Sequence, residues 1–253
     1  MQRGTARCGP KYLAGLLVGG VLLAGCGGGA IDTAPPASPA TSATSAPVAA
    51  TPRLASVDNF RDVAGEGYAN AAGQHLTRGV LYRSNALTPN PADQAALDAL
   101  HPTAVYDVRT AAEITQKPER VPAGAVYTNI PILSGDLTAA VKTIKTPDGA
   151  RAFLTDMYRS FVTGPQERAG FAKLLTAVAN TAGPQVINCT GGKDRTGWAA
   201  ALLLIIAGVP QDTITKDYLL SNDYSRTSVQ TTMDQIRASQ GEAVAKLKSK
   251  LVP

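Results

Sequence analysis

Along most of the chain, segments with short apolar runs alternate with segments in which apolar residues recur at helical spacing. Short apolar runs rich in β-branched and aromatic residues predict strands at 79–84, 104–109, 126–133 and 185–188. Apolar residues at helical spacing predict helices at 92–100, 150–162, 166–180 and 197–208, and two or three more between 211 and 251. Strands that alternate with helices predict an α/β fold: a mainly parallel central sheet flanked by helices, with additional helices at the C-terminus.

The beginning of the chain has a different pattern. Arg3, Arg7 and Lys11 precede an apolar stretch, Tyr12 to Leu23, that is too short to span a bilayer comfortably. A basic segment before an apolar one is typical of an export signal. The sequence Leu23-Ala24-Gly25-Cys26 resembles the bacterial lipobox. This resemblance implies a lipoprotein signal peptide at 1–25, lipidation of Cys26, and a membrane-anchored protein on the periplasmic side or the cell surface; an ordinary secretory signal is the alternative.

Composition changes again after Cys26. Residues 26–53 consist largely of Ala, Pro, Ser and Thr, which cannot bury a core, so a disordered linker is expected there. The remaining segment, 54–253, is long enough for one domain of ordinary size. We therefore expect a folded domain held to a membrane by a flexible tether.

Charge and cysteine content exclude several functions. The net charge is +5, but Arg3, Arg7 and Lys11 supply three of these charges and no basic run follows, so a nucleic-acid partner is not expected. The cysteines are Cys8, Cys26 and Cys189, and the histidines are His75 and His101. Their spacing matches no usual zinc site, so neither a metal nor another cofactor is expected.

The most informative stretch is Cys189-Thr190-Gly191-Gly192-Lys193-Asp194-Arg195-Thr196-Gly197, between a predicted strand and a predicted helix. Gly191 and Gly192 allow backbone conformations in which successive amides face one point. The helix start, Lys193 and Arg195 add positive charge around that point. Such a loop is expected to bind a dianion such as phosphate and to favour the thiolate form of Cys189. The thiolate would then be a ready nucleophile.

The spacing Cys-x5-Arg resembles the signature loop of cysteine-dependent phosphatases. The whole string Cys-x-x-Gly-Lys-Asp-Arg-Thr-Gly is similar to one bacterial branch, often exported, with tyrosine or dual-specificity phosphatase activity. Segments 59–65, 81–84 and 106–109, with Glu113, follow the same order as in that branch. The resemblance implies a tyrosine phosphatase-like fold and hydrolysis of phosphate monoesters on phosphorylated proteins, phosphotyrosine first and phosphoserine or phosphothreonine after it.

The resemblance also implies roles for individual residues. Cys189 would form a phosphocysteine intermediate, and Arg195 would bind two phosphate oxygens through its planar guanidinium. The amides from Thr190 through Gly191, Gly192 and Lys193 to Arg195 would bind the remaining oxygens. Thr196 or a nearby hydroxyl would help the thiolate to leave in the second step.

Two features depart from the family pattern. Asn188 stands where the family usually has His before the cysteine, so the thiolate receives less positive charge. The Trp-Pro-Asp loop of the larger tyrosine phosphatases is absent, and Trp198 is expected in the core. The leaving oxygen needs a proton donor. Asp194 is favoured by the motif, Asp136 by topology, and Asp107 is a third candidate.

Other functions remain open on the sequence alone. A phosphoinositide or inositol phosphate phosphatase would use the same mechanism, and Lys193 favours it because added charge suits a polyphosphorylated ring. A catalytically inactive phosphate-binding module is favoured by Asn188. Cys189 could also be a buried structural cysteine, which is the commoner state of a lone cysteine. A cysteine protease is disfavoured because neither histidine of this sequence has a suitable setting.

Overall fold

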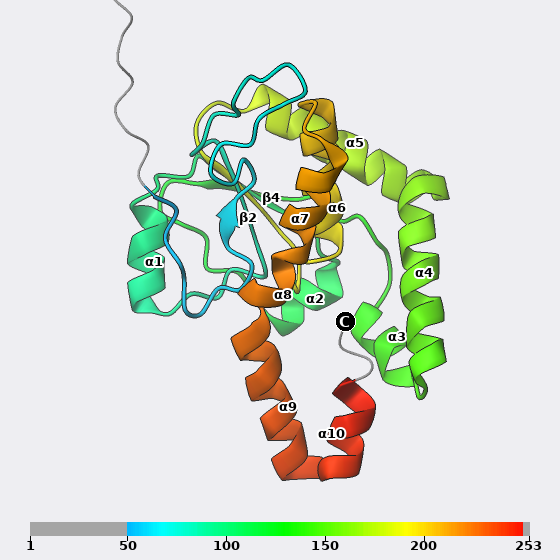
Figure 1. Cartoon of the computed structure of the whole chain (residues 1–253). Coiled ribbons are helices and arrows are strands. Elements are labelled where there is room, and N and C mark those ends of the chain that lie inside the picture. The colour runs from blue at the N-terminus through cyan, green and yellow to red at the C-terminus, as the bar shows by residue number, and fades with distance from the viewer. Residues whose placement is uncertain (1–49, 250–253) are drawn as a thin grey trace, which may run out of the picture. The chain divides into compact units, whose positions relative to one another are not determined.

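The computed structural model describes residues 50–249 (Figure 1). The predicted signal peptide at 1–25, Cys26 and the linker up to residue 49 lie outside the described residues. Within 50–249, none of the helices combines the length and the hydropathy that crossing a bilayer requires. The same residues contain no group of three or more His, Cys, Asp or Glu side chains arranged to hold a metal ion.

A five-stranded sheet forms the centre of the domain, in the order β1-β2-β5-β3-β4. The strands are β1 (Arg61–Asp62), β2 (Leu81–Ser84), β3 (Ala104–Asp107), β4 (Val126–Asn129) and β5 (Gln185–Asn188). β2, β5, β3 and β4 are parallel, and β1 is an antiparallel edge strand. The predicted α/β class with a mainly parallel sheet is confirmed.

Helices connect and flank the strands (Figure 1). Before β5 they are α1 (Pro91–Asp98), α2 (Ala111–Gln116), α3 (Leu137–Thr143), α4 (Pro147–Thr163) and α5 (Pro165–Asn180). After β5 they are α6 (Arg195–Ile206), α7 (Gln211–Leu219), α8 (Ser221–Tyr224), α9 (Arg226–Gln240) and α10 (Glu242–Ser249). The C-terminal segment thus has more helices after α6 than the two or three expected, because the polar stretch breaks at Leu220, Ser225 and Gly241.

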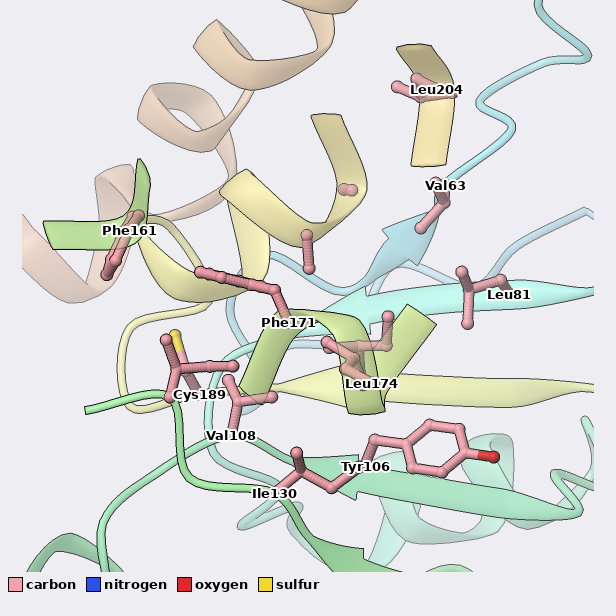
Figure 2. Close-up of a cluster of buried hydrophobic side chains, with 14 of the residues drawn as sticks. Val63, Leu81, Tyr106, Val108, Ile130, Phe161, Phe171, Leu174, Cys189 and Leu204 are labelled. Carbon is pink, nitrogen blue, oxygen red and sulfur yellow. The ribbon is translucent and has the colours of Figure 1, made fainter. Parts of the chain in front are cut away.

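Both faces of the sheet are covered. Val186 and Ile187 are adjacent in β5 and point to opposite faces, as side chains of a strand do. On one face Val186 packs in a cluster with residues of β2, β3 and α1, and on the other Ile187 packs with residues of α4, α5, α6 and α7. Figure 1 shows α1 on one side of the sheet and α5, α6 and α7 on the other, and Figure 2 shows the larger cluster.

Strand register decides where the site lies. Asn188 at the end of β5 is paired with Ser84 of β2 and Asp107 of β3. The three parallel strands therefore end at one edge, where ligands of open α/β sheets bind. Cys189 is the first residue after β5, so the loop singled out in the sequence lies at this edge.

Candidate active site

The loop from Cys189 to Asp194 turns sharply between β5 and α6. Gly192 has a φ of +69°, in the left-handed region that favours glycine. A Cβ atom at Gly192 would lie 2.5 Å from the backbone nitrogen of Asn85, whereas a Cβ at Gly191 would meet nothing within 4 Å. Gly192 is therefore required for the loop to pass close to β2, and Gly191 is not required on steric grounds.

Carbonyl groups of the loop are held by hydrogen bonds from outside it. The Gly191 carbonyl accepts from Asn59 Nδ2 at 2.8 Å, and the Gly192 carbonyl accepts from Arg83 Nη2 at 2.9 Å. Among the described residues, no backbone N–H from Thr190 to Arg195 donates to a protein acceptor outside a regular helix or strand. Amides without protein partners in a turn that opens a helix form an anion-binding nest.

Arg195 is fixed by Glu113, the third residue of α2. Its Nη1 and Nη2 donate to the two carboxylate oxygens of Glu113 at 2.7 and 2.6 Å. Thr190 Oγ1 also donates to Glu113. The two Glu113 oxygens occupy the Nη1–Nη2 edge of the guanidinium. The edge formed by Nε and one Nη is therefore left for a phosphate, which Arg binds in bidentate fashion.

The pKa values of this pair follow from its geometry. Burial raises the pKa of Glu113, but the hydrogen bonds and charge of Arg195 outweigh it and lower that pKa to about 2. Burial lowers the pKa of Arg195. The Glu113 hydrogen bonds and the charge of Cys189 raise it by more than burial lowers it, so the net shift is upward. Both groups are therefore charged at neutral pH.

Cys189 combines a core position with access to a cavity. It is 2% exposed and belongs to the larger hydrophobic cluster, where Figure 2 shows it beside Val108. It also lines a cavity of about 390 Å³ together with Arg195 and Asp194. The charge of Cys189 favours the protonated forms of Arg83, Lys193 and Arg195, so three cations act on the sulfur.

The three candidate proton donors have different surroundings. Asp194 lines the cavity with Cys189. Asp136 is exposed and caps α3 by accepting from Ala139 N at 2.9 Å. Asp107 is buried and forms an ion pair with Arg109 at 2.8 Å. Of the three, Asp194 alone is among the residues that line this cavity.

A buried ion cluster supports the loop from beneath. Asp217 of α7 accepts from Arg61 of β1 at 3.1 Å and from Arg83 of β2 at 3.0 Å. Arg83 is the residue that holds the Gly192 carbonyl. Burial lowers the pKa of Arg83 to about 10, which still leaves it charged at neutral pH. The cluster thus ties the loop to β1, β2 and α7.

Asn188, which replaces the family's usual histidine, also has a defined partner. Its Nδ2 donates to Glu119 Oε1 at 2.9 Å. Burial raises the pKa of Glu119 to about 7. Glu119 also accepts from Leu87 N at 2.8 Å, so it joins the residue before the cysteine to the loop after β2.

Sequence reasoning missed several of these contacts. Glu113 follows the family's order in the sequence and forms a capping box with Thr110, but nothing in the sequence shows that it also holds Arg195. Asp217 carried no sequence signal, because its partners lie more than 130 positions away. Thr196 is buried, and its Oγ1 has no hydrogen-bond partner within the described part of the chain. Trp198, expected in the core, is only partly buried and packs against Phe161 at the edge of the larger cluster.

Fold and site together define an α/β protein with a thiol-bearing loop at the carboxyl edge of its sheet, whose amides are oriented to receive an anion. The Tyrosine phosphatase family matches residues 52–251 of this chain. The chain belongs to that family.

Two bacterial proteins are similar in sequence. The chain is 34% identical over 185 residues to a protein of Cupriavidus necator named as a tyrosine-protein phosphatase, covering 70% of this chain and 65% of that protein. It is 33% identical over 191 residues to the triple specificity protein phosphatase PtpB of Mycobacterium tuberculosis, covering 65% of this chain and 67% of PtpB. The chain thus spans about two thirds of the length of these relatives.

Solved structures give a looser match. The P. aeruginosa protein TpbA in complex with pTyr matches with a TM-score of 0.31 at 16% identity, over 57% of this chain and 70% of that one. The catalytic domain of the PP-IP phosphatase SIW14 from S. cerevisiae matches with a TM-score of 0.34 at 15% identity, over 72% of this chain and 95% of that one.

Proposed function

We propose that this protein is a cysteine-dependent phosphatase that hydrolyses phosphate monoesters, phosphotyrosine first among them, through a phosphocysteine at Cys189. The observation that carries the proposal is the set of loop amides between Thr190 and Arg195 that have no acceptor within residues 50–249, next to the guanidinium edge that Glu113 leaves open. These donors fit the three non-bridging oxygens of a phosphate, and Cys189 lines the same cavity.

In the first step the Cys189 thiolate attacks phosphorus. A sulfur–phosphorus bond forms, the ester oxygen–phosphorus bond breaks, and the electron pair moves to the ester oxygen. Asp194 transfers its proton to that oxygen, so an alcohol leaves rather than an alkoxide. The loop amides and Arg195 stabilise the charge on the equatorial oxygens throughout.

In the second step water attacks the phosphocysteine. The Asp194 carboxylate accepts a proton from the water, an oxygen–phosphorus bond forms, and the sulfur–phosphorus bond breaks. The electron pair returns to sulfur, so inorganic phosphate and the thiolate are regenerated. Lys193, Arg83 and Arg195 favour the thiolate as leaving group because each is a nearby cation.

The cavity walls support an aryl substrate. Leu137 and Val141 of α3, and Phe153, Leu154 and Met157 of α4, line the same cavity as Cys189. An apolar wall above a phosphate nest favours the ring of phosphotyrosine over a bare alkyl phosphate. The names of the relatives, a tyrosine-protein phosphatase and a triple specificity protein phosphatase, support the same proposal.

Replacement of the sulfur tests the proposal. Cys189→Ser should abolish hydrolysis of an aryl phosphate, while tungstate, a phosphate analogue, still raises Tm because the amides and Arg195 remain. Arg195→Lys should weaken both hydrolysis and tungstate binding, since Lys cannot bind two oxygens in a plane. Arg151→Lys, at an exposed arginine of α4, is the matched control and should change neither. Full hydrolysis by Cys189→Ser would exclude the mechanism.

A phosphoinositide substrate is the second candidate. Lys193 and Arg226 line a neighbouring cavity of about 530 Å³, which also includes Gly191 of the loop and the carboxylates of Asp58 and Asp194. Two cations beside the phosphate nest favour a substrate with further phosphate groups. Comparison of kcat/KM on phosphotyrosine peptides and on phosphoinositides separates the two candidates, and Lys193→Ala should lower the phosphoinositide value more than the phosphotyrosine value.

We further propose that the protein is exported and anchored by lipid at Cys26. The support is in the sequence: a basic segment, an apolar stretch from Tyr12 to Leu23, and the lipobox-like Leu23-Ala24-Gly25-Cys26. Residues 26–53 would then serve as the tether of the domain that begins at about residue 54.

A further inference from the structure

Asp194 is the end of a chain of hydrogen bonds. Tyr158 Oη donates to Asp194 Oδ1 at 2.6 Å. The hydroxyl oxygens of Tyr158 and Tyr218 are 2.7 Å apart. A hydroxyl has one hydrogen, and that of Tyr158 is used on Asp194, so Tyr218 must donate to Tyr158. The chain therefore runs in one direction, from Tyr218 through Tyr158 to the carboxylate.

Both tyrosines remain protonated at neutral pH. Burial, and then the charge of Asp194, raise the pKa of Tyr158 far above its usual value. Burial is also the largest cause of the raised pKa of Tyr218. The two hydroxyls are therefore hydrogen-bond donors whether Asp194 is charged or neutral.

The ring of Tyr158 is held by its neighbours. It makes edge contacts with Phe161 at 5.3 Å and with Trp198 at 6.1 Å between ring centroids. Tyr158 directly follows Met157, which lines the cavity over Cys189. Tyr218 directly follows Asp217, which belongs to the buried ion cluster. The hydrogen bonds between Tyr218, Tyr158 and Asp194 thus join α4 and α7 at the carboxyl group next to the loop.

We propose that Tyr158, oriented by Tyr218, is a positioning residue for the general acid Asp194. This inference rests on the proposed phosphatase function. A hydrogen bond donated to Oδ1 leaves Oδ2 as the oxygen that carries the transferable proton. When that proton moves to the leaving group, a negative charge appears on the carboxyl group, and the bond from Tyr158 becomes a stronger, charge-assisted one. Tyr158 therefore contributes most in the transition state.

Leaving-group dependence separates this role from a structural one. Tyr158→Phe keeps the ring contacts and removes the hydroxyl. For phenyl phosphate, whose leaving group needs a proton, we expect kcat/KM, which reports on the step that forms the phosphocysteine, to fall about tenfold, which is a part of the 10²–10⁴ that a general acid contributes. For 4-nitrophenyl phosphate, whose leaving group departs as an anion, we expect less than a twofold change. KM should stay similar for both substrates.

Three variants complete the experiment. Tyr218→Phe should give a smaller loss with the same leaving-group dependence. Tyr106→Phe is the matched control, because the hydroxyl of Tyr106 lies 2.7 Å from Thr181 Oγ1 rather than near Asp194. This variant should leave kcat/KM unchanged on both substrates. In an Asp194→Asn background, Tyr158→Phe should add no further loss, because two residues that act through one proton are not additive.

Each result decides between alternatives. Equal losses on both substrates, no loss on either, or the full tenfold loss in the Asp194→Asn background would overturn the positioning role while leaving the phosphatase function intact. A wild-type protein that hydrolyses neither aryl phosphate would instead overturn the proposed function, and this inference with it.

Discussion

At the scale of single residues, the shape of the anion-binding loop depends on Gly192 far more than on Gly191. The φ of +69° at Gly192 is strained for any other residue, and a Cβ there would collide with the backbone at Ser84 and Asn85, which cannot move without moving β2. Gly191 faces open space. Two adjacent glycines in the same motif therefore have different structural importance.

This difference gives a matched pair of variants. Gly192→Ala should lower the free energy of unfolding by more than about 1 kcal/mol, since it adds a clash to an unfavourable φ. It should also abolish the rise in Tm caused by tungstate. Gly191→Ala should retain that rise. Chemical denaturation and thermal melts with and without tungstate measure both effects, and similar behaviour of the two variants would contradict the loop geometry.

Glu113 predicts a dependence of stability on pH. Its pKa is about 2 in the folded protein against 4.5 for the unperturbed group. The contribution of its charge to stability is therefore fully present above about pH 4.5 and is lost as pH falls toward 2. Between pH 7 and pH 3 the loss should be roughly 2 kcal/mol.

Urea unfolding at pH 7 and pH 3 measures this loss. Glu113→Gln removes the titrating group. The difference in the free energy of unfolding between pH 7 and pH 3 should therefore be smaller than in the wild type by that amount. At pH 7 the variant should also have a reduced kcat, because Arg195 loses a charged partner. Glu167→Gln, at an acid in the first turn of α5, is the control for general charge effects. An unchanged pH difference in Glu113→Gln would show that its carboxyl does not carry the effect.

Elements differ in how well the sequence predicts them. β5 was predicted with its observed bounds because four residues between turn-forming segments are buried on both faces. β1 was missed because a strand of two residues, Arg61–Asp62, has no period to detect. α3 was missed because its seven residues make fewer than two turns, too few for an apolar face to repeat. Periodicity thus finds elements that bury a repeating face.

The site was predictable where its residues are close in sequence. Cys189 and Arg195 share one loop, so spacing alone brought them together. Glu113, Tyr158 and Asp217 reach the loop from α2, α4 and α7. Their contacts depend on how these helices pack, which a single sequence does not reveal. The predicted candidate that lies by the cysteine, Asp194, is likewise one of the loop's own residues.

Packing of α7 against the sheet should depend on Asp217. The side chains of Arg61, Arg83 and Asp217 are 4%, 1% and 2% exposed. Asp217→Ala would leave two buried cations without their carboxylate, which costs about 3–5 kcal/mol. Asp212→Ala, at an exposed position of the same helix, should cost less than about 1 kcal/mol. Equal costs for the two variants, measured by urea unfolding, would contradict the role of the buried ion cluster.

At the scale of the whole molecule, the chemistry is confined to the domain. The proposed nucleophile, guanidinium and proton donor, with their supports, all lie between Asn59 and Tyr218. The features that indicate export lie before residue 27. Since no residue of the first group is needed for the second, activity and location should be separable by mutation.

Cys26→Ser tests that separation in the full-length chain. If Cys26 carries the lipid, the variant should leave the membrane fraction, because a single apolar signal of about a dozen residues does not hold a protein in a bilayer once the lipid is missing. Its kcat/KM on an aryl phosphate should equal that of the wild type, because the proposed catalytic thiol is Cys189. Cys8→Ser is the control and should fractionate as the wild type does. A Cys26→Ser variant that stays with the membranes would show that lipid at this residue is not the anchor, and a loss of activity would show that the terminus acts on the site.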